Sequence, residues 1–269
     1  MADSDAVRGA GLPDRLPSAP AQSTAQTPPT PAPATEPDKV MTLVDHLTEL
    51  RSRLVRSILA VVVGTGIGFY FFKPLRDMLI QPLPEDKRHL QALAPGDGFA
   101  IALQIAVIAG IILAMPILLY QLWAFVSPGL TPAERRALRP WIPLALFFFA
   151  LGVTIAYVIL PFAIAFLLAF TDDVLVANLA APQYFGFVTT MFLAFGLLME
   201  FPIVLYGLAR VGILSSARLT ASRRIVIPSL FAFAAVATPG GDLVSPTVLW
   251  ITMVILFQLT ILAIRRSGR

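Results

Sequence analysis

Phe195-Gly-Leu-Leu-Met-Glu200-Phe-Pro202 lies inside a long apolar run, residues 184–208, in which Glu200 is the only charged residue. A run of this length can cross a hydrocarbon core about 30 Å thick as a helix. A charge at the centre of such a helix costs roughly 2.5 kcal/mol or more, so a carboxylate there usually faces a partner or a wet cavity. The stretch therefore predicts a membrane protein in which Glu200 serves a function.

The composition of the whole chain agrees with this class. Hydrophobic residues make up 57% and charged residues 13% of the chain, against about 25% charged residues in a typical soluble domain. There is no cysteine, which excludes disulfides, thiolate metal sites and thiol nucleophiles. His46 and His89 lie far apart in the sequence, so we expect no metal and no cofactor. No nucleic-acid-binding motif is present.

The first part of the chain is of a different kind. In residues 1–39, prolines alternate with Ala, Ser, Thr and Gln. Such a segment buries too little apolar surface to offset its ordering entropy. We predict a disordered cytoplasmic tail at residues 1–39 and a membrane domain at residues 40–269.

Six apolar runs predict an all-α membrane protein with six transmembrane helices. The first four are long enough to cross the membrane, the fifth reaches only about 20 Å at 1.5 Å per residue, and the sixth is marginal. With its last two helices short, the protein is expected to be cupped, with Glu200 on the concave side, rather than a closed bundle. The runs are residues 54–72, 99–126, 141–170, 184–208, 225–237 and 246–264.

The basic residues predict the orientation of these helices. Lys and Arg gather before the first run, in the second and fourth connections and in the C-terminal tail. The third and fifth connections, residues 171–183 and 238–245, have none, and the first mixes Lys and Arg with Asp and Glu. The positive-inside rule then puts both termini in the cytoplasm of a multi-pass cell-membrane protein.

The segment before the first run predicts a helix with two faces. Leucines at helical spacing form an apolar stripe, which is typical of an amphipathic helix at the membrane interface that runs into the span. His46, Glu49 and Arg53 share a second face, where Glu49 is either a binding group or a local partner of Arg53, worth a few tenths of a kcal/mol. The stripe consists of Leu43, Leu47, Leu50 and Leu54.

Two further patterns have structural explanations. Thr131, Pro132 and Glu134 have the order of a helix start with a capping box, which explains Glu134 without any binding function. Gly64 and Gly68 in the first run follow no strand, which excludes a nucleotide-binding turn. They predict close contact with a neighbouring helix.

Five segments, in one order along residues 41–264, resemble the TatC family, the polytopic component of the twin-arginine protein translocase. Together with the agreeing predicted topology they are far more specific than any one motif. The segments are His46-Leu-Thr-Glu-Leu-Arg-Ser-Arg-Leu54, Tyr120-Gln-Leu-Trp-Ala-Phe125, Glu134-Arg135-Arg136, Ala194-Phe-Gly-Leu-Leu-Met-Glu200-Phe-Pro202 and Thr238-Pro-Gly-Gly-Asp242.

The resemblance implies a receptor rather than an enzyme. Members of this family bind signal peptides with two adjacent arginines at the cytoplasmic face and help to move folded proteins across the membrane. The resemblance further implies single-span partners of the TatA and TatB types, self-association in a larger complex, and transport driven by the proton-motive force. It implies no nucleic-acid partner.

The resemblance also implies roles for particular residues. The family often has glutamate where this chain has Gln258, so a function that needs a charge there is not expected. The implied signal-peptide site consists of Glu49, Glu134, Arg51, Leu47 and Phe125. Glu200 and Gln258 are the implied intramembrane contacts to partners. Pro82 and Asp242 form the implied external-side motif.

Two other readings are compared with this one. A proton-coupled small-solute transporter that uses Glu200 would also have proline-broken helices, but it predicts inverted repeats and a second polar midplane group. The sequence shows no convincing internal repeat, and this reading leaves the two cytoplasmic carboxylates unexplained. An intramembrane enzyme would need a Ser–His, metal or paired-Asp arrangement within the spans, and none is present. For Glu200 itself, a buried acid satisfied within its own bundle stays an alternative.

Overall fold

The structure is a computed structural model that describes residues 43–170, 179–238 and 241–266. The predicted disordered tail, residues 1–39, lies outside the described residues. The described part of the chain belongs to one compact unit, Thr42–Arg269. It consists of helices, with one isolated parallel bridge between Gln91 and Ala180.

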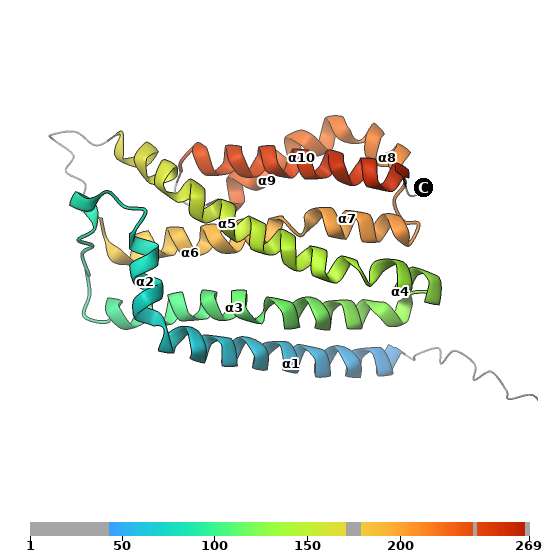
Figure 1. The fold of residues 1–269 in the computed structure, drawn as a ribbon, viewed down its shortest axis with the longest axis horizontal. Helices are drawn as coiled ribbons and strands as arrows, with labels where there is room; N and C mark the ends of the chain where they lie inside the picture. Colours follow the sequence, from blue (N-terminus) through green and yellow to red (C-terminus); the bar gives the residue numbers. More distant parts are fainter. Residues whose placement is uncertain (1–42, 171–178, 239–240, 267–269) are drawn as a thin grey trace, which may run out of the picture. The chain divides into compact units, whose positions relative to one another are not determined.

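The helices follow the apolar runs closely (Figure 1). Two 3₁₀ turns, η1 (Glu85–Lys87) and η2 (Ser127–Gly129), lie in the connections. The α-helices are α1 (Leu43–Tyr70), α2 (Phe72–Ile80), α3 (Asp97–Val126), α4 (Pro132–Leu138), α5 (Trp141–Leu168), α6 (Ala181–Leu198), α7 (Phe201–Arg210), α8 (Ser216–Ala221), α9 (Arg223–Ala237) and α10 (Val244–Arg266).

Five helical segments among the described residues are long and apolar enough to cross a membrane, which confirms the predicted all-α membrane class. The short α9 is not among them, because its 15 residues reach only about 22 Å. A count of six spans therefore stays a prediction. The five segments are His46–Tyr70, Asp97–Gly129, Trp141–Leu168, Ala181–Arg210 and Val244–Arg266.

The last helix is longer than the run that predicted it. α10 has 23 residues, or about 35 Å, so of the two final helices only α9 is short. Asp242 accepts a hydrogen bond from the backbone N–H of Ser245 at 2.6 Å, which stabilises an earlier helix start. Arg265 and Arg266 lie in the last turn, where cations interact favourably with the helix dipole.

Glycines let α1 and α3 approach closely. A Cβ atom at Gly64 would lie 2.6 Å from the carbonyl oxygen of Gly110, and one at Gly68 would lie 2.7 Å from that of Ala106. Only a residue without a side chain fits at such distances. The prediction of close helix contact through Gly64 and Gly68 is confirmed.

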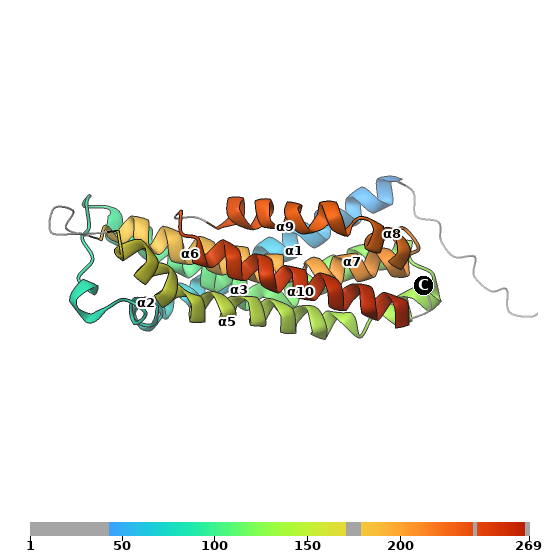
Figure 2. The same ribbon diagram turned by 90° about the horizontal axis from the view of Figure 1, so that it is seen from above.

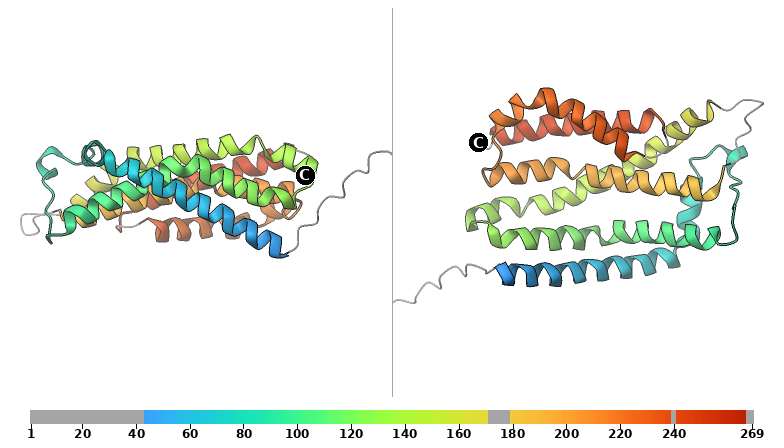
Figure 3. Two further views of the ribbon diagram at one scale, coloured as in Figure 1. Left: turned by 90° about the horizontal axis from the view of Figure 1, so that it is seen from below. Right: turned by 180° about the vertical axis from the view of Figure 1, so that it is seen from behind.

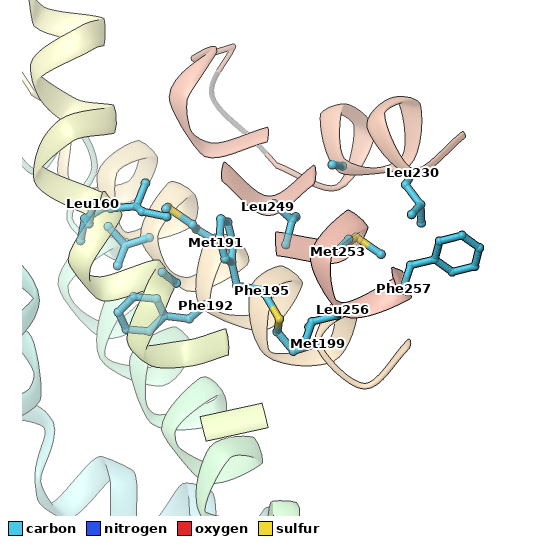
Figure 4. Packing of buried hydrophobic residues seen from close by; sticks show 14 of the residues in the cluster. Leu160, Met191, Phe192, Phe195, Met199, Leu230, Leu249, Met253, Leu256 and Phe257 are labelled. Carbon is cyan, nitrogen blue, oxygen red and sulfur yellow. The ribbon is translucent and has the colours of Figure 1, made fainter. Parts of the chain in front are cut away.

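The buried core lies among α5, α6 and α10. Met199, Phe195, Met253 and Phe257 are each at most 1% exposed (Figure 4). α5 and α6 meet at Gly152, where a Cβ would lie 2.4 Å from the carbonyl oxygen of Phe195. α3 packs on α5 and α6, α10 packs on α5, α7 and α9, and α1 packs mainly on α3 (Figure 3).

The two ends of the helix bundle differ in charge. The beginning of α1, α4, α8 and the last turn of α10 lie at one end, here called the arginine-rich end (Figures 1 and 2). Its arginines include Arg135, Arg136, Arg218, Arg265 and Arg266.

At the opposite end, around α2 and η1, bases and acids pair with each other. Arg76 Nη2 lies 2.7 Å from Asp77 Oδ1, Lys87 lies 3.7 Å from Asp86, and Arg88 lies 3.8 Å from Glu85. The helices thus gather the excess positive charge at one end, as the positions of Lys and Arg in the sequence indicate.

Candidate functional site

Glu49 lies on the face of α1 that is turned toward α3. Its side chain is 18% exposed and accepts hydrogen bonds on Oε1 from Arg53, one turn further along the helix. The Arg53 Nε atom is 2.9 Å from Oε1, and Nη2 donates to the same oxygen. The local Glu49–Arg53 pair, one of the two readings that the sequence left open, is thus present.

Arg53 and His46 connect this face of α1 to the last turns of α3. Arg53 Nη1 donates to Gln121 Oε1 at 3.3 Å. The rings of His46 and Phe125 are stacked, with centroids 4.5 Å apart and an interplanar angle of 24°. We call His46, Glu49, Arg53, Gln121 and Phe125 the α1–α3 patch.

One oxygen of Glu49 in this patch is unsatisfied. Oε2 is buried, and no described residue donates a hydrogen bond to it. An ionised carboxylate can accept about four hydrogen bonds on its two oxygens. Leaving a buried acceptor unpaired costs about 1–3 kcal/mol, so Oε2 is a favourable place for a further donor.

The described leucines of the apolar stripe lie on the neighbouring face of α1 and are exposed. Leu47 is 64% exposed, and Leu50 and Leu54 are exposed as well. Arg51, four residues after Leu47, is also exposed. The helix runs without a break from Leu43 into the span, so the predicted interfacial helix is the first part of α1 itself.

Glu134 forms the capping box that its spacing predicted. Glu134 Oε2 accepts hydrogen bonds from the N–H and the hydroxyl of Thr131, at 3.0 and 2.9 Å, and Thr131 Oγ1 accepts from the Glu134 N–H at 3.4 Å. Arg135 donates to the carbonyl oxygen of Ser127 at 2.8 Å, which ties α4 to the turn that follows α3. Glu134 therefore lies at the arginine-rich end, as the beginning of α1 does (Figure 1).

Glu200 lies at a break in the fourth apolar segment, between α6 and α7. Pro202, in the first turn of α7, has no N–H to continue the hydrogen-bond ladder of α6. The Glu200 side chain caps neither helix, and its Oε1 is buried with no donor among the described residues. Within the described residues, Glu200 is therefore not fully satisfied by hydrogen bonds from its own bundle.

The other predicted site residues lie apart from the α1–α3 patch. Gln258 is half-buried on α10, which packs on α7, the helix that begins directly after Glu200. Pro82 is half-buried after α2. Asp242 is 5% exposed, holds the start of α10 through Oδ2, and has no described donor to the buried Oδ1. Residues 239–240 of its motif lie outside the described residues.

Sequence reasoning missed two amides that connect helices. Gln121 binds Arg53 of α1, and Gln104 of α3 donates to the hydroxyl of Thr189 on α6 at 2.8 Å. Both lie in the otherwise apolar run 99–126, and a buried amide needs hydrogen-bond partners. A search for polar residues inside apolar runs would have identified both. No cluster of three metal-ligating residues is present in the described ranges.

The long apolar helices are in close contact through glycines, and half-buried carboxylates lie at one end and at a helix break. These features define a polytopic membrane protein with polar positions inside its spans. The family model of the Sec-independent protein translocase protein (TatC) matches residues 45–251. The chain belongs to this family.

Relatives and a solved structure agree over most of the chain. The TatC proteins of Carboxydothermus hydrogenoformans and Aquifex aeolicus are 36% and 34% identical over 225 and 226 residues, which is 83% and 82% of this chain and 93% of each relative. A crystal structure of the twin arginine translocase receptor TatC superposes with a TM-score of 0.72 at 34% identity, covering 81% of this chain and 99% of that chain.

Membership of this family settles the general class of function. The chain is a membrane subunit of a protein translocase, not an enzyme. The prediction of protein transport by twin-arginine translocation is confirmed at this level.

Proposed function

We propose that this chain is the receptor subunit of a twin-arginine translocase and binds the signal peptides of folded proteins at its cytoplasmic face. The observation that carries the proposal is Glu49, a half-buried carboxylate with one buried oxygen that no described residue satisfies. It lies at the arginine-rich end of a chain of the TatC family.

The chemistry of the two carboxylates suits a pair of arginines. Guanidinium groups match carboxylates through paired N–H groups, and Arg is charged at all working pH values. Glu49 and Glu134, on two different elements of one end, would each bind one arginine of the signal. The stacked ring of Phe125 and the exposed side chains of Leu47 and Arg51 would contact the rest of the peptide.

The test is the affinity of the purified chain for a twin-arginine peptide. Glu49→Gln and Glu134→Gln should each weaken binding about tenfold or more, because a charge-assisted hydrogen bond contributes about 1.5–3 kcal/mol. Salt should weaken binding of the unaltered chain, as expected for partly exposed ion pairs. A twin-lysine peptide is the ligand control.

Thr131→Ala is the matched protein control. It removes the hydroxyl that caps α4 but keeps the charge of Glu134, whereas Glu134→Gln keeps most of the cap and loses the charge. We expect Thr131→Ala to lower the stability of α4 by about 0.5–2 kcal/mol and to weaken binding less than Glu134→Gln. Unchanged binding in both glutamine variants would remove these residues from the site.

We further propose that Glu200 and Gln258 contact single-span partners of the TatA and TatB types. A polar side chain of such a partner could donate to the buried Glu200 Oε1, which lies within a helix break of a membrane-length segment. Gln258 keeps hydrogen-bonding capacity without a charge. The complex would also include further copies of this chain and would use the proton-motive force.

The proposed location is the cell membrane, with both termini in the cytoplasm. This orientation places the arginine-rich end inside, and it requires α9 to count as a sixth, short span. The motif around Pro82 and Asp242 would then face outward, where Asp242 holds the start of α10.

A further inference from the structure

The proposed arginine-binding carboxylate already has an arginine partner within the protein. Arg53 donates to Glu49 Oε1 through Nε, at 2.9 Å, and through Nη2. The charge of Glu49 is therefore balanced by a residue of its own helix. A cationic peptide meets a paired carboxylate and must compete with that pair.

Arg53 has a second partner that would stay with it after exchange. Its Nη1 atom donates to Gln121 Oε1 on α3 at 3.3 Å, and its side chain is 20% exposed. A buried charge that loses its only partner is strongly destabilised. Because Gln121 and solvent remain available, Arg53 can release Glu49 without that penalty.

Glu49 also has an unused oxygen for the incoming donor. Arg53 binds Oε1, while Oε2 is buried with no donor among the described residues. Because Oε2 is buried, a peptide guanidinium reaches it only as Arg53 moves toward Gln121. The guanidinium can then bind both oxygens of Glu49, whereas Arg53 binds one.

We infer that Arg53 is an internal competitor for Glu49, which lowers the affinity of the site for cationic peptides until a peptide group replaces it. The inference rests on the proposed function, in which Glu49 binds a signal-peptide arginine. A second guanidinium replaces Arg53 with the same planar set of donors. A lysine ammonium is a strongly hydrated point charge and replaces two guanidinium N–H groups at a net loss.

The experiment compares twin-arginine and twin-lysine peptides on the full chain in detergent or lipid discs. Arg53→Gln should raise the affinity for both peptides by about the same factor, because each has to displace Arg53 in the unaltered chain. The gain should be roughly threefold or more, the factor that corresponds to about 0.7 kcal/mol, within the range of partly exposed ion pairs. Arg53→Lys, which keeps the charge and the helix-forming side chain, should give a smaller gain.

Arg56→Gln is the matched control. Arg56 is exposed on the same helix, and its removal takes away the same charge without touching Glu49. It should raise both affinities less than Arg53→Gln does, because the Glu49–Arg53 pair stays in place. Thermal unfolding of every variant shows whether the helices still pack.

The outcomes separate this inference from the function on which it rests. Weaker or unchanged binding of both peptides to Arg53→Gln would mean that Arg53 does not compete for Glu49. Glu49→Gln in the same assay tests the site itself. If Glu49→Gln binds as the unaltered chain does, the proposed signal-peptide site is wrong. If Glu49→Gln loses binding while Arg53→Gln gains no affinity, only the inference is wrong.

Discussion

Glu200 combines three features at one residue: a carboxylate, a helix break and a buried oxygen without a described donor. The sequence predicted its position in an apolar run and its contact with a partner or a wet cavity. It did not predict that the backbone changes from one helix to another at this residue. Pro202 was a visible signal for that break, but many prolines only bend a membrane helix, because neighbours satisfy the freed carbonyls.

We predict that Glu200→Ala leaves the chain inserted and folded but weakens transport or assembly with single-span partners. Glu200→Gln should be milder, because an amide keeps hydrogen bonding and loses only the charge. Export of a folded twin-arginine reporter and co-purification of the partners measure the two effects. If both variants transport and assemble as the unaltered chain does, Glu200 is a tolerated structural acid.

The α1–α3 patch shows which contacts residue spacing in the sequence can predict and which it cannot. The Glu49–Arg53 pair and the Thr131–Glu134 capping box are local, and both could be predicted from residue spacing. The contacts of Arg53 with Gln121 and of His46 with Phe125 join residues that are far apart in the sequence. Such contacts depend on how α1 lies against α3, which hydrophobic periodicity does not specify.

Among the helices, the α1–α3 contact offers the sharpest test of packing. We predict that Gly64→Ala destabilises the protein by about 1–3 kcal/mol, the usual cost of overpacking. The new methyl group would lie 2.6 Å from the backbone oxygen of Gly110, which cannot move aside without separating the helices. Thermal unfolding in detergent measures the effect.

Gly66→Ala is the control for that substitution. A Cβ at Gly66 meets nothing within 4 Å, and the position lies between the same two contact glycines. It should unfold at or slightly above the temperature of the unaltered chain, because alanine favours a helix over glycine by about 1 kcal/mol. Equal destabilisation by both substitutions would show that α1 and α3 do not pack through Gly64.

The short α9 depends on its neighbour α10. Trp250 Nε1 donates to the carbonyl oxygen of Ile227 at 2.9 Å, and the rings of Phe231 and Trp250 meet edge to face with centroids 5.6 Å apart. We predict that Trp250→Phe, which keeps an aromatic ring and loses the donor, costs about 0.5–1.5 kcal/mol. Proteolysis near α9 should increase while the remaining helices stay protected. No change in either measurement would mean that ring packing alone holds α9.

Across the whole chain, the distribution of charge predicts which end of the helix bundle faces the cytoplasm. Three bases of the opposite end, Arg76, Lys87 and Arg88, pair with nearby acids, whereas the arginine-rich end keeps its positive excess. We predict that a cysteine at Asp86 in η1 reacts with an impermeant thiol reagent in intact cells. A cysteine at Ala217 in α8 should react only after the membrane is opened.

The chain contains no cysteine of its own, so only the introduced cysteine can react with the reagent. Both positions are exposed, so access to the reagent depends on the side of the membrane and not on burial. Labelling of position 217 in intact cells, with protection of position 86, would reverse the proposed orientation.

The number of spans is the property of the whole molecule that hydropathy predicts least well. Four long runs were clear from apolar length and the final run was marginal, and the structure places membrane-length helical segments on all five. α9 has only 15 residues, so length does not show whether it crosses the membrane. Whether α9 crosses the membrane depends on the thickness of the surrounding bilayer and on its contact with α10. The sequence of α9 specifies neither.

The pairing of α1 with α3 bears on how the protein is made. Because α1 packs mainly on α3, its contact surface is complete once Val126 has left the ribosome. α10, the last helix to be synthesised, packs on α5, α7 and α9 and completes the core around Phe195 and Phe257. The first hairpin can thus assemble in the bilayer during translation, whereas the rest of the bundle waits for the end of the chain.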